Sequence, residues 1–131
     1  MSATGKGSKN ELIYIVDDEA LLGQLAETVL TEAGFRTRTF LDPVDALRAV
    51  RDESERPDVL VTDFVMGSMT GIELIEGCKA CHPKLRTILL SGTVNETEVS
   101  AHDTQPDLFI PKPYRVGAFV KSVIELIKSQ R

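Results

Sequence analysis

Three aspartates are the first candidates for chemistry, because each directly follows a short apolar run. Asp17 and Asp18 follow the run from Leu12 to Val16, and Asp63 follows the run from Val59 to Thr62. Carboxylates brought together would repel one another by about 4 kcal/mol per pair at a separation of ~4 Å in an effective dielectric of about 20. A divalent cation removes that cost, and an all-oxygen ligand set suits Mg²⁺, with Mn²⁺ as the alternative ion.

Two further polar side chains stand in the same kind of position. The run from Thr87 to Leu90 ends in Ser91, and the run from Leu108 to Pro111 ends in Lys112. A carboxylate beside a hard cation and an ammonium is equipped to attack a phosphoryl group, because phosphoryl transfer depends mainly on positioning and charge neutralisation. Ser91 could donate a hydrogen bond to the transferred group. The predicted chemistry is therefore phosphoryl transfer onto Asp63.

Short strands alternating with helical patterns must position these side chains. Apolar runs without polar alternation suit strands that are buried on both faces of a parallel sheet. The segment 36–40 alternates and carries arginines, and the last run contains Pro111, so both suit sheet edges. The element order predicts one α/β domain, doubly wound around a five-stranded parallel sheet with helices on both faces. Its edge features fit the strand order 2-1-3-4-5, and ligands bind such sheets outside the carboxyl ends of the strands.

Helical patterns fill the gaps between the runs. The first pattern is stopped by Gly34 in a C′ position, and Asp42 and Pro43 read as the N-cap and N1 residues of a helix that reaches about Arg51. A third helix is expected to end near His82, before a proline. The apolar stripes expected to face the core comprise Leu21, Leu22, Leu25, Ala26, Val29, Leu30 and Ala33 in the first helix, Leu74, Cys78 and Cys81 in the third, and Val116, Val120, Val123, Ile124 and Ile127 in the last.

The segment 94–105 has almost no apolar face, so a short helix of low stability is expected there. Gly92 adds backbone freedom just upstream of it. A low-stability element next to Ser91, which could contact the transferred group, can be reordered by a small bias from one phosphoryl group. We therefore expect this segment to be the mobile part of a phosphorylation switch.

Composition excludes several classes of function. The chain has 131 residues, 42% of them apolar, and a formal net charge of -5, which suits one domain with a proper core. No basic run or membrane-length apolar stretch appears, so direct binding to nucleic acid or to a membrane is not expected. Residues 1–10 are small and polar and read as a flexible N-terminal tail before a domain at 11–131. Two cysteines and no export signal indicate the cytoplasm.

Some of these residues also have less specific interpretations. Asp17 and Asp18 alone would more often be a helix N-cap pair, and Lys112 alone would be a solvated charge. The segment 78–82 reads C-x-x-C-H, which fits c-type haem attachment, but its cysteines lie in the core-facing register of a helix. They are expected to be small buried or half-buried residues. The functional interpretation of the aspartates rests on their coincidence with Ser91 and Lys112 at strand ends.

With these residues in place, the sequence resembles the response-regulator receiver domain of two-component signalling, from about Glu11 to Lys128. The residues that carry the resemblance are Asp17, Asp18, Asp63, Ser91, Lys112 and Pro113, together with Met66, Gly71 and Phe109. The resemblance implies a flavodoxin-like fold of the CheY-like superfamily. It also implies a phospho-acceptor rather than an enzyme that acts on free substrates.

The resemblance further implies individual roles. Asp63 would accept a phosphoryl group from a histidine kinase or a histidine phosphotransfer protein. Asp18 and Asp63 would bind Mg²⁺ directly, Asp17 mostly through water, and the backbone carbonyl of Val65 would be a further ligand. Lys112 would pair first with Asp63 and then with the phosphoryl group.

Ser91 and Phe109 would form the switch pair of the family, with the hydroxyl moving toward the phosphate and the ring turning inward. The peptide bond between Lys112 and Pro113 would be cis. The sequence departs from the family in three places: Gly67 and Gly92 stand where proline and alanine are common, and the fourth helix is unusually polar.

Several alternatives stay open at this point. A small aspartyl phosphatase would need a cap or substrate pocket, and a flavin- or nucleotide-binding module would need a glycine-rich loop after the first strand. A receiver could also act only as an unphosphorylated docking module. Output is expected through contacts with an unknown downstream protein, and a homodimer is left open. The chain could stand alone, or be the receiver module of a hybrid histidine kinase or of a regulator whose output domain is absent here.

Overall fold

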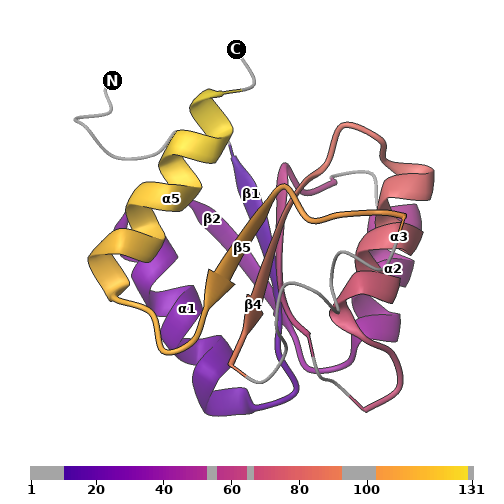
Figure 1. Cartoon of the computed structure of the whole chain (residues 1–131), viewed down its shortest axis with the longest axis horizontal. Coiled ribbons are helices and arrows are strands. Elements are labelled where there is room, and N and C mark those ends of the chain that lie inside the picture. The colour runs from indigo at the N-terminus through magenta and orange to yellow at the C-terminus, as the bar shows by residue number, and fades with distance from the viewer. Residues whose placement is uncertain (1–10, 53–55, 65–66, 93–102, 130–131) are drawn as a thin grey trace.

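The computed structural model describes residues 11–52, 56–64, 67–92 and 103–129, which build one parallel sheet between two layers of helices (Figure 1). The sheet has the order β2-β1-β3-β4-β5, and every neighbouring pair of strands is parallel. Its strands are β1 (Leu12–Val16), β2 (Arg36–Phe40), β3 (Val59–Asp63), β4 (Arg86–Ser91) and β5 (Leu108–Pro111). The predicted strand order is confirmed, as is the placement of segments 36–40 and 108–111 at the two edges.

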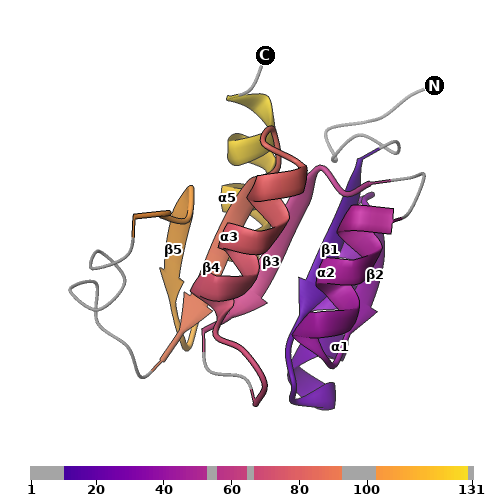
Figure 2. The same cartoon turned by 90° about the vertical axis from the view of Figure 1, so that its right-hand side faces the viewer.

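Alternate strand residues face two separate core clusters. On one face, Tyr14, Leu60 and Leu89 pack with the helices α2 (Pro43–Asp52) and α3 (Gly71–Cys81). These two helices lie side by side over the sheet (Figure 2). Because successive side chains of a strand point to opposite faces, the continuous apolar runs fill both clusters at once.

The opposite face carries the helices α1 (Ala20–Glu32) and α5 (Val116–Lys128). Their buried side chains pack with Ile15, Val61 and Leu90 in the second cluster. Helices on both faces of the sheet are therefore confirmed (Figure 1). None of the helices in the described ranges is long and apolar enough to cross a membrane.

Local signals set the ends of the helices as predicted. Gly34 has a φ of 103°, and its N–H donates to Thr31 while that of Phe35 donates to Leu30, which closes α1 in a Schellman arrangement. The positive φ requires the glycine. At α2, the carboxylate of Asp42 accepts the N–H of Val44 at 2.9 Å, so the predicted N-cap is confirmed.

The predicted apolar stripe of α1 is partly wrong. Ala26 and Leu30 are buried, but Leu21 is 80% exposed, Leu25 is 47% exposed and Leu22 is 37% exposed. The helix carries more apolar residues than one sheet-facing side can hold, and its inward side is centred on Gly23, Ala26 and Leu30. The surplus leucines lie at the surface beside the carboxyl end of β1.

A smaller correction concerns α5. Its buried side chains are Phe119, Val123 and Ile127, whereas Val116, which was expected in the stripe, is 45% exposed. The helix is rotated so that the large ring of Phe119 fills the first inward position. The short helix expected within 94–105 falls largely outside the described residues, so both that helix and its mobility stay predictions.

A polar contact fixes the start of the edge strand β5. The carboxylate of Asp107 accepts the N–H of Thr87 at 2.8 Å and lies 3.3 Å from the ammonium of Lys79. In return, the N–H of Asp107 donates to the hydroxyl of Thr87 at 3.1 Å. These bonds join the residue before β5 to β4 and to the end of α3.

The two cysteines differ in their surroundings, and this predicts a difference in reactivity. Cys78 is buried in the core, and burial raises the pKa of its thiol to about 12, whereas Cys81 is half-buried. A raised pKa means that less thiolate is present at any pH below it. A disulfide reagent at about pH 8 is therefore expected to modify one thiol in the folded protein and both after denaturation. In Cys81→Ser the fast-reacting thiol should disappear, and two fast thiols in the native protein would contradict the prediction.

Candidate functional site

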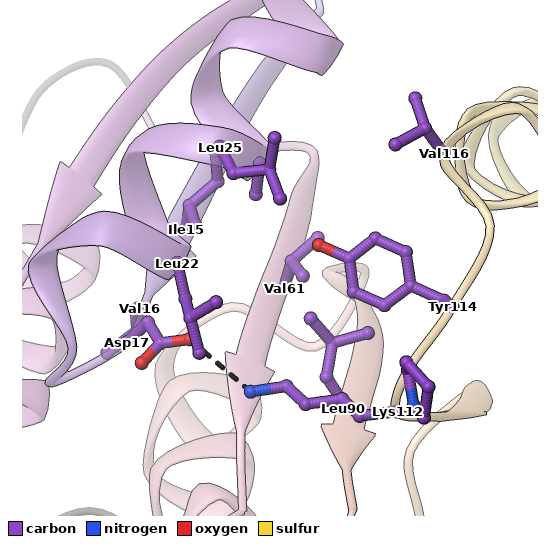
Figure 3. A pocket seen from close by; sticks show the side chains of 12 residues that line it. Ile15, Val16, Asp17, Leu22, Leu25, Val61, Leu90, Lys112, Tyr114 and Val116 are labelled. Atoms are coloured by element: carbon purple, nitrogen blue, oxygen red, sulfur yellow. Dashed lines mark ion pairs between the residues drawn. The ribbon is translucent and has the colours of Figure 1, made fainter.

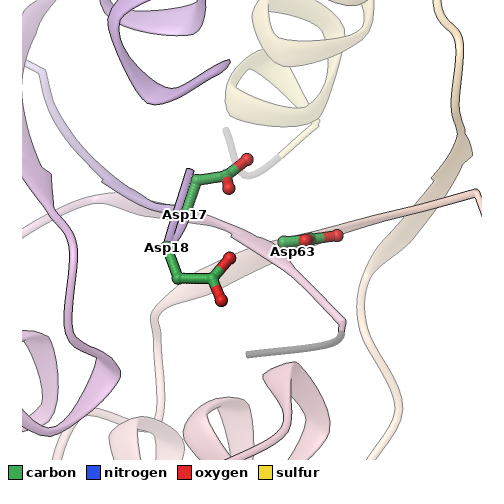
Figure 4. A group of neighbouring side chains, drawn as sticks. All are labelled: Asp17, Asp18 and Asp63. Atoms are coloured by element: carbon green, nitrogen blue, oxygen red, sulfur yellow. The ribbon is translucent and has the colours of Figure 1, made fainter. Parts of the chain in front are cut away.

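The polar residues predicted at strand ends meet at one edge of the sheet. Asp17 and Asp18 follow β1, Asp63 ends β3, and a carboxylate oxygen from each lies within 4.8 Å of one from each of the others. Figure 4 shows the three aspartates near one another at this edge of the sheet. The structure therefore brings together the three aspartates that the sequence singled out, because β1 and β3 are neighbours in the sheet.

Asp17 is held firmly from both sides. Its side chain is buried, its N–H donates to the carbonyl of Phe40 at 3.1 Å, and its carboxylate accepts the N–H of Glu19 at 2.9 Å. These bonds leave Asp17 facing inward and the neighbouring Asp18 exposed. The site therefore has one carboxylate that is fixed in the protein and one that is open to water.

Asp63 is partly buried beside them. Its carboxylate accepts the N–H of Phe64 at 2.9 Å and lies 3.4 Å from the ammonium of Lys112. Burial raises the pKa of the Asp63 carboxyl above its usual value; the ammonium of Lys112 opposes that change, and the nearby charge of Asp17 adds to it. A bound divalent cation would favour the ionised carboxylate, which is the nucleophilic form.

Lys112 reaches two carboxylates rather than one. Its ammonium lies 3.4 Å from Asp63 and 3.6 Å from Asp17, and its backbone N–H donates to the carbonyl of Ser91 at 3.0 Å. The pairing with Asp63 was implied by the resemblance, whereas the contact with Asp17 was not anticipated. The cis peptide bond between Lys112 and Pro113 is confirmed.

The proposed switch residues lie near this edge on β4 and β5. Ser91 is the last residue of β4 and is 3% exposed. Phe109 pairs with Leu89 across the strands and is half-buried against the cluster beneath α2 and α3. Val65 lies outside the described residues, as does Met66, so the backbone ligand at Val65 stays a prediction.

A capping box that was not predicted from the sequence holds the start of α3 beside the site. The hydroxyl of Thr70 accepts the N–H of Glu73, and the Glu73 carboxylate accepts the N–H of Thr70, which makes a capping box. Directly after it, the N–H of Gly71 donates to the carbonyl of Phe64 at 2.8 Å. The spacing of Thr70 and Glu73 was a readable signal for this helix start.

The donor set fits a hard divalent cation. Three carboxylates offer only oxygen ligands, one oxygen of each lies within 4.8 Å of the others, and the exposure of Asp18 leaves access for water. Mg²⁺ prefers such a combination of a few carboxylates and several waters. Among the residues that the structure describes, Lys112 is the one whose ammonium forms ion pairs with these carboxylates, and one positive charge does not balance three negative ones.

Comparisons with known proteins agree on the family. The family model described as the response regulator receiver domain matches residues 13–124. The DNA-binding transcriptional regulator NtrC of Escherichia coli strain K12 is 30% identical over 113 residues, which are 86% of this chain and 24% of that protein. The sensor kinase CckA of Brucella abortus is 25% identical over 126 residues, 94% of this chain and 13% of that protein. The chain thus spans about a quarter or less of the length of these relatives.

Solved structures agree on the fold. A response regulator receiver domain protein from Clostridium thermocellum superposes with a TM-score of 0.83 at 21% identity, covering 92% of this chain and 96% of the other. NtrX from Brucella abortus, crystallised with ADP, gives a TM-score of 0.80 at 30% identity, with 90% of this chain and 27% of that chain covered. The first likeness covers nearly all of both chains.

Proposed function

The chain belongs to the response regulator receiver domain family, and from this we propose that it is a signalling switch that takes a phosphoryl group onto Asp63 in a Mg²⁺-dependent reaction. One observation carries the proposal. The carboxylate of Asp63 lies 3.4 Å from the ammonium of Lys112 and within 4.8 Å of the carboxylates of Asp17 and Asp18. That arrangement supplies a nucleophile, a counter-charge and a cation site in one place.

The proposed donor is a phosphohistidine on a histidine kinase or a histidine phosphotransfer protein. A carboxylate oxygen of Asp63 would attack phosphorus while the phosphorus–nitrogen bond breaks, and the electron pair of that bond returns to the imidazole ring. The product is an acyl phosphate on Asp63. Lys112 is placed to neutralise charge on the transferred group, and Ser91 to donate a hydrogen bond to it.

The residues that would hold the cation are Asp17, Asp18 and Asp63, with the carbonyl of Val65 as a proposed fourth ligand. When bound, Mg²⁺ would supply positive charge beside the transferred phosphoryl oxygens. Asp17 is already oriented by the N–H of Glu19 at 2.9 Å, so little rearrangement of this residue is needed. Mn²⁺ has the same ligand preferences and is expected to substitute.

Acetyl phosphate tests the proposal without any partner protein. We expect the purified chain to gain one phosphoryl group in the presence of Mg²⁺, as seen by intact mass measurement, and to gain none when the metal is chelated. Absence of labelling with Mg²⁺, or equal labelling after chelation, would contradict it. Turnover of a small phosphomonoester would instead favour the aspartyl phosphatase.

The exposure of Asp18 leads to a separate prediction about the metal. Asp18→Ala removes one ligand and leaves the nucleophile, so Mg²⁺ affinity should fall by at least about 10- to 100-fold, the loss typical when only an outer-shell partner is removed. Labelling at low Mg²⁺ should slow, and high Mg²⁺ should partly restore it. Calorimetric titration with Mg²⁺ measures the affinity, and Glu19→Ala is the matched control because its side chain is outside the acidic cluster. Equal Mg²⁺ affinity in the two variants would show that Asp18 is not a ligand of the ion.

The surrounding system is proposed from the relatives. Sequence likeness to NtrC and to CckA suits either a transcriptional regulator or a hybrid kinase as the larger protein of which such a receiver is a part. The proposed output is a protein–protein contact that changes with phosphorylation. Both cysteines are free thiols, which suits the reducing cytoplasm as the proposed location.

A further inference from the structure

A cavity of about 220 Å³ lies between α1 and the sheet and borders the acidic cluster at Asp17 (Figure 3). Its floor is formed by core side chains of three neighbouring strands, namely Ile15, Val61 and Leu90. Ala26 is the buried residue of α1 that lines it. Because alanine is small, the helix leaves this space unfilled above the strands.

The rim of the cavity is also apolar, and it is open. Leu22 and Leu25 of α1 stand on one side and Val116 of α5 on the other, with exposures of 37%, 47% and 45%. These are the side chains that were expected to be part of the core stripes. A buried apolar floor under an exposed apolar rim would gain free energy from any apolar body that fills it.

Three polar groups line the cavity at its mouth. The ammonium of Lys112 is 3.6 Å from the carboxylate of Asp17, so each already has a partner. Figure 3 shows the hydroxyl of Tyr114 directed into the cavity, on the side of Val61. The ring of Tyr114 packs on Phe119 with centroids 4.7 Å apart, which fixes its direction. Burial raises the pKa of this hydroxyl, so it stays neutral and can both donate and accept.

The charges around the mouth select the kind of ligand. A free anion would meet the carboxylate of Asp17, which lines the cavity, and a cation would have to leave water for an apolar floor next to Lys112. An uncharged molecule avoids both costs. A cavity of about 150 Å³ holds benzene in another protein, so this one is large enough for a single aromatic ring with a polar substituent.

We propose that this cavity is a binding site for a small uncharged aromatic molecule with one hydrogen-bonding group, held by the apolar floor and rim and by the hydroxyl of Tyr114. Asp17 and Lys112 border both this cavity and the proposed phosphorylation site, whereas Asp18 and Asp63 do not line the cavity. Binding to the unphosphorylated, metal-free protein does not depend on the proposed function.

Phenol is the probe for a first test. Titration of ¹⁵N-labelled protein with phenol should give saturable shifts at backbone amides of residues that line the cavity, with a dissociation constant on the order of 1 mM for a ligand of this size. Benzoate should bind at least several-fold more weakly. Shifts that do not saturate, or that lie elsewhere on the chain, would overturn the proposal. The alternative occupant of the cavity would then be an apolar side chain of a partner protein.

Variants then locate the site. Ala26→Leu fills the cavity and should abolish the phenol shifts. Leu25→Ala should weaken binding several-fold, whereas Leu21→Ala removes a more exposed leucine of the same helix that does not line the cavity and should leave binding unchanged. Equal effects of the two leucine variants would overturn the assignment.

Tyr114→Phe keeps the ring and removes the hydroxyl, so it covers the case in which Ala26→Leu does not fold. We expect phenol to bind about 2- to 10-fold more weakly to this variant, the effect of one hydrogen bond, while benzene binds equally to both proteins. An unchanged phenol affinity would show that the hydroxyl of Tyr114 does not bind the ligand.

Discussion

Asp63→Asn is expected to take up no phosphoryl group from acetyl phosphate, the largest effect on activity that we predict. The amide has the shape of the carboxylate but is not a nucleophile, so the acceptor is lost while its surroundings remain. Asp63 accepts an N–H from Phe64 and lies next to Lys112, and an amide oxygen can keep the first of these contacts. Labelling is measured by intact mass, and circular dichroism shows whether the fold is retained.

The control is an aspartate far from the acidic cluster. Asp52 is exposed in the last turn of α2, and Asp52→Asn should be labelled at the normal rate. Labelling of Asp63→Asn at the normal rate and extent would show that another residue is the acceptor, with Asp17 and Asp18 as the first candidates. Loss of labelling in both variants would mean that the assay reports something other than the acceptor.

Gly71→Ala should have the largest effect on stability. A Cβ atom at Gly71 would overlap the backbone carbonyl oxygen of Asp63 and lie 2.7 Å from Cδ1 of Leu89. The side chain of Leu89 could move, but the backbone of β3 could not without disturbing the acceptor. We expect the free energy of unfolding to fall by about 3 kcal/mol, at the upper end of the usual cost of overpacking. Urea unfolding followed by circular dichroism measures this change, and labelling of Asp63 should also slow.

Gly67 offers a matched control in the same β3–α3 connection. A Cβ atom there would meet nothing within 4 Å, so Gly67→Ala should change stability by no more than about 0.5 kcal/mol. Similar losses in both variants would show that the connection needs glycine for its backbone conformation. A stable Gly71→Ala protein would show that α3 can shift away from Asp63.

Much of the site was predictable because its residues follow apolar runs. Asp17, Asp63 and Lys112 each stand at the end of a strand, and the parallel sheet brings those ends to one edge. Local rules were equally informative at Gly34 and Asp42, where the backbone needs particular residue types.

The rotation of helices could not be read from periodicity. The leucines of α1 recur at helical spacing, but spacing alone does not say which of several adjacent rows faces the sheet. Small residues settled the matter, since Gly23 and Ala26 allow α1 to approach while Leu21 remains 80% exposed. The same limit hid Phe119 as the first inward residue of α5.

Contacts between side chains from different elements were also beyond the sequence. The sharing of Lys112 between Asp17 and Asp63 depends on how a long, flexible side chain settles between two acceptors. The direction of the Tyr114 hydroxyl depends on the packing of its ring on Phe119. Neither is encoded in a local pattern, and both concern the surroundings of the acceptor rather than its identity.

The strand β5 is anchored at both ends, and this has a mechanical consequence. Asp107 ties its beginning to Thr87 and Lys79, and the ion pairs of Lys112 tie the chain just after its end to β1 and β3. A strand of four residues between two such anchors has little freedom to slide. Phe109 stands between the anchors and is only half-buried, so its ring can rotate about its own side-chain bonds while the backbone stays in place. The backbone of β5 can therefore stay fixed while the side chain of Phe109 changes its rotamer.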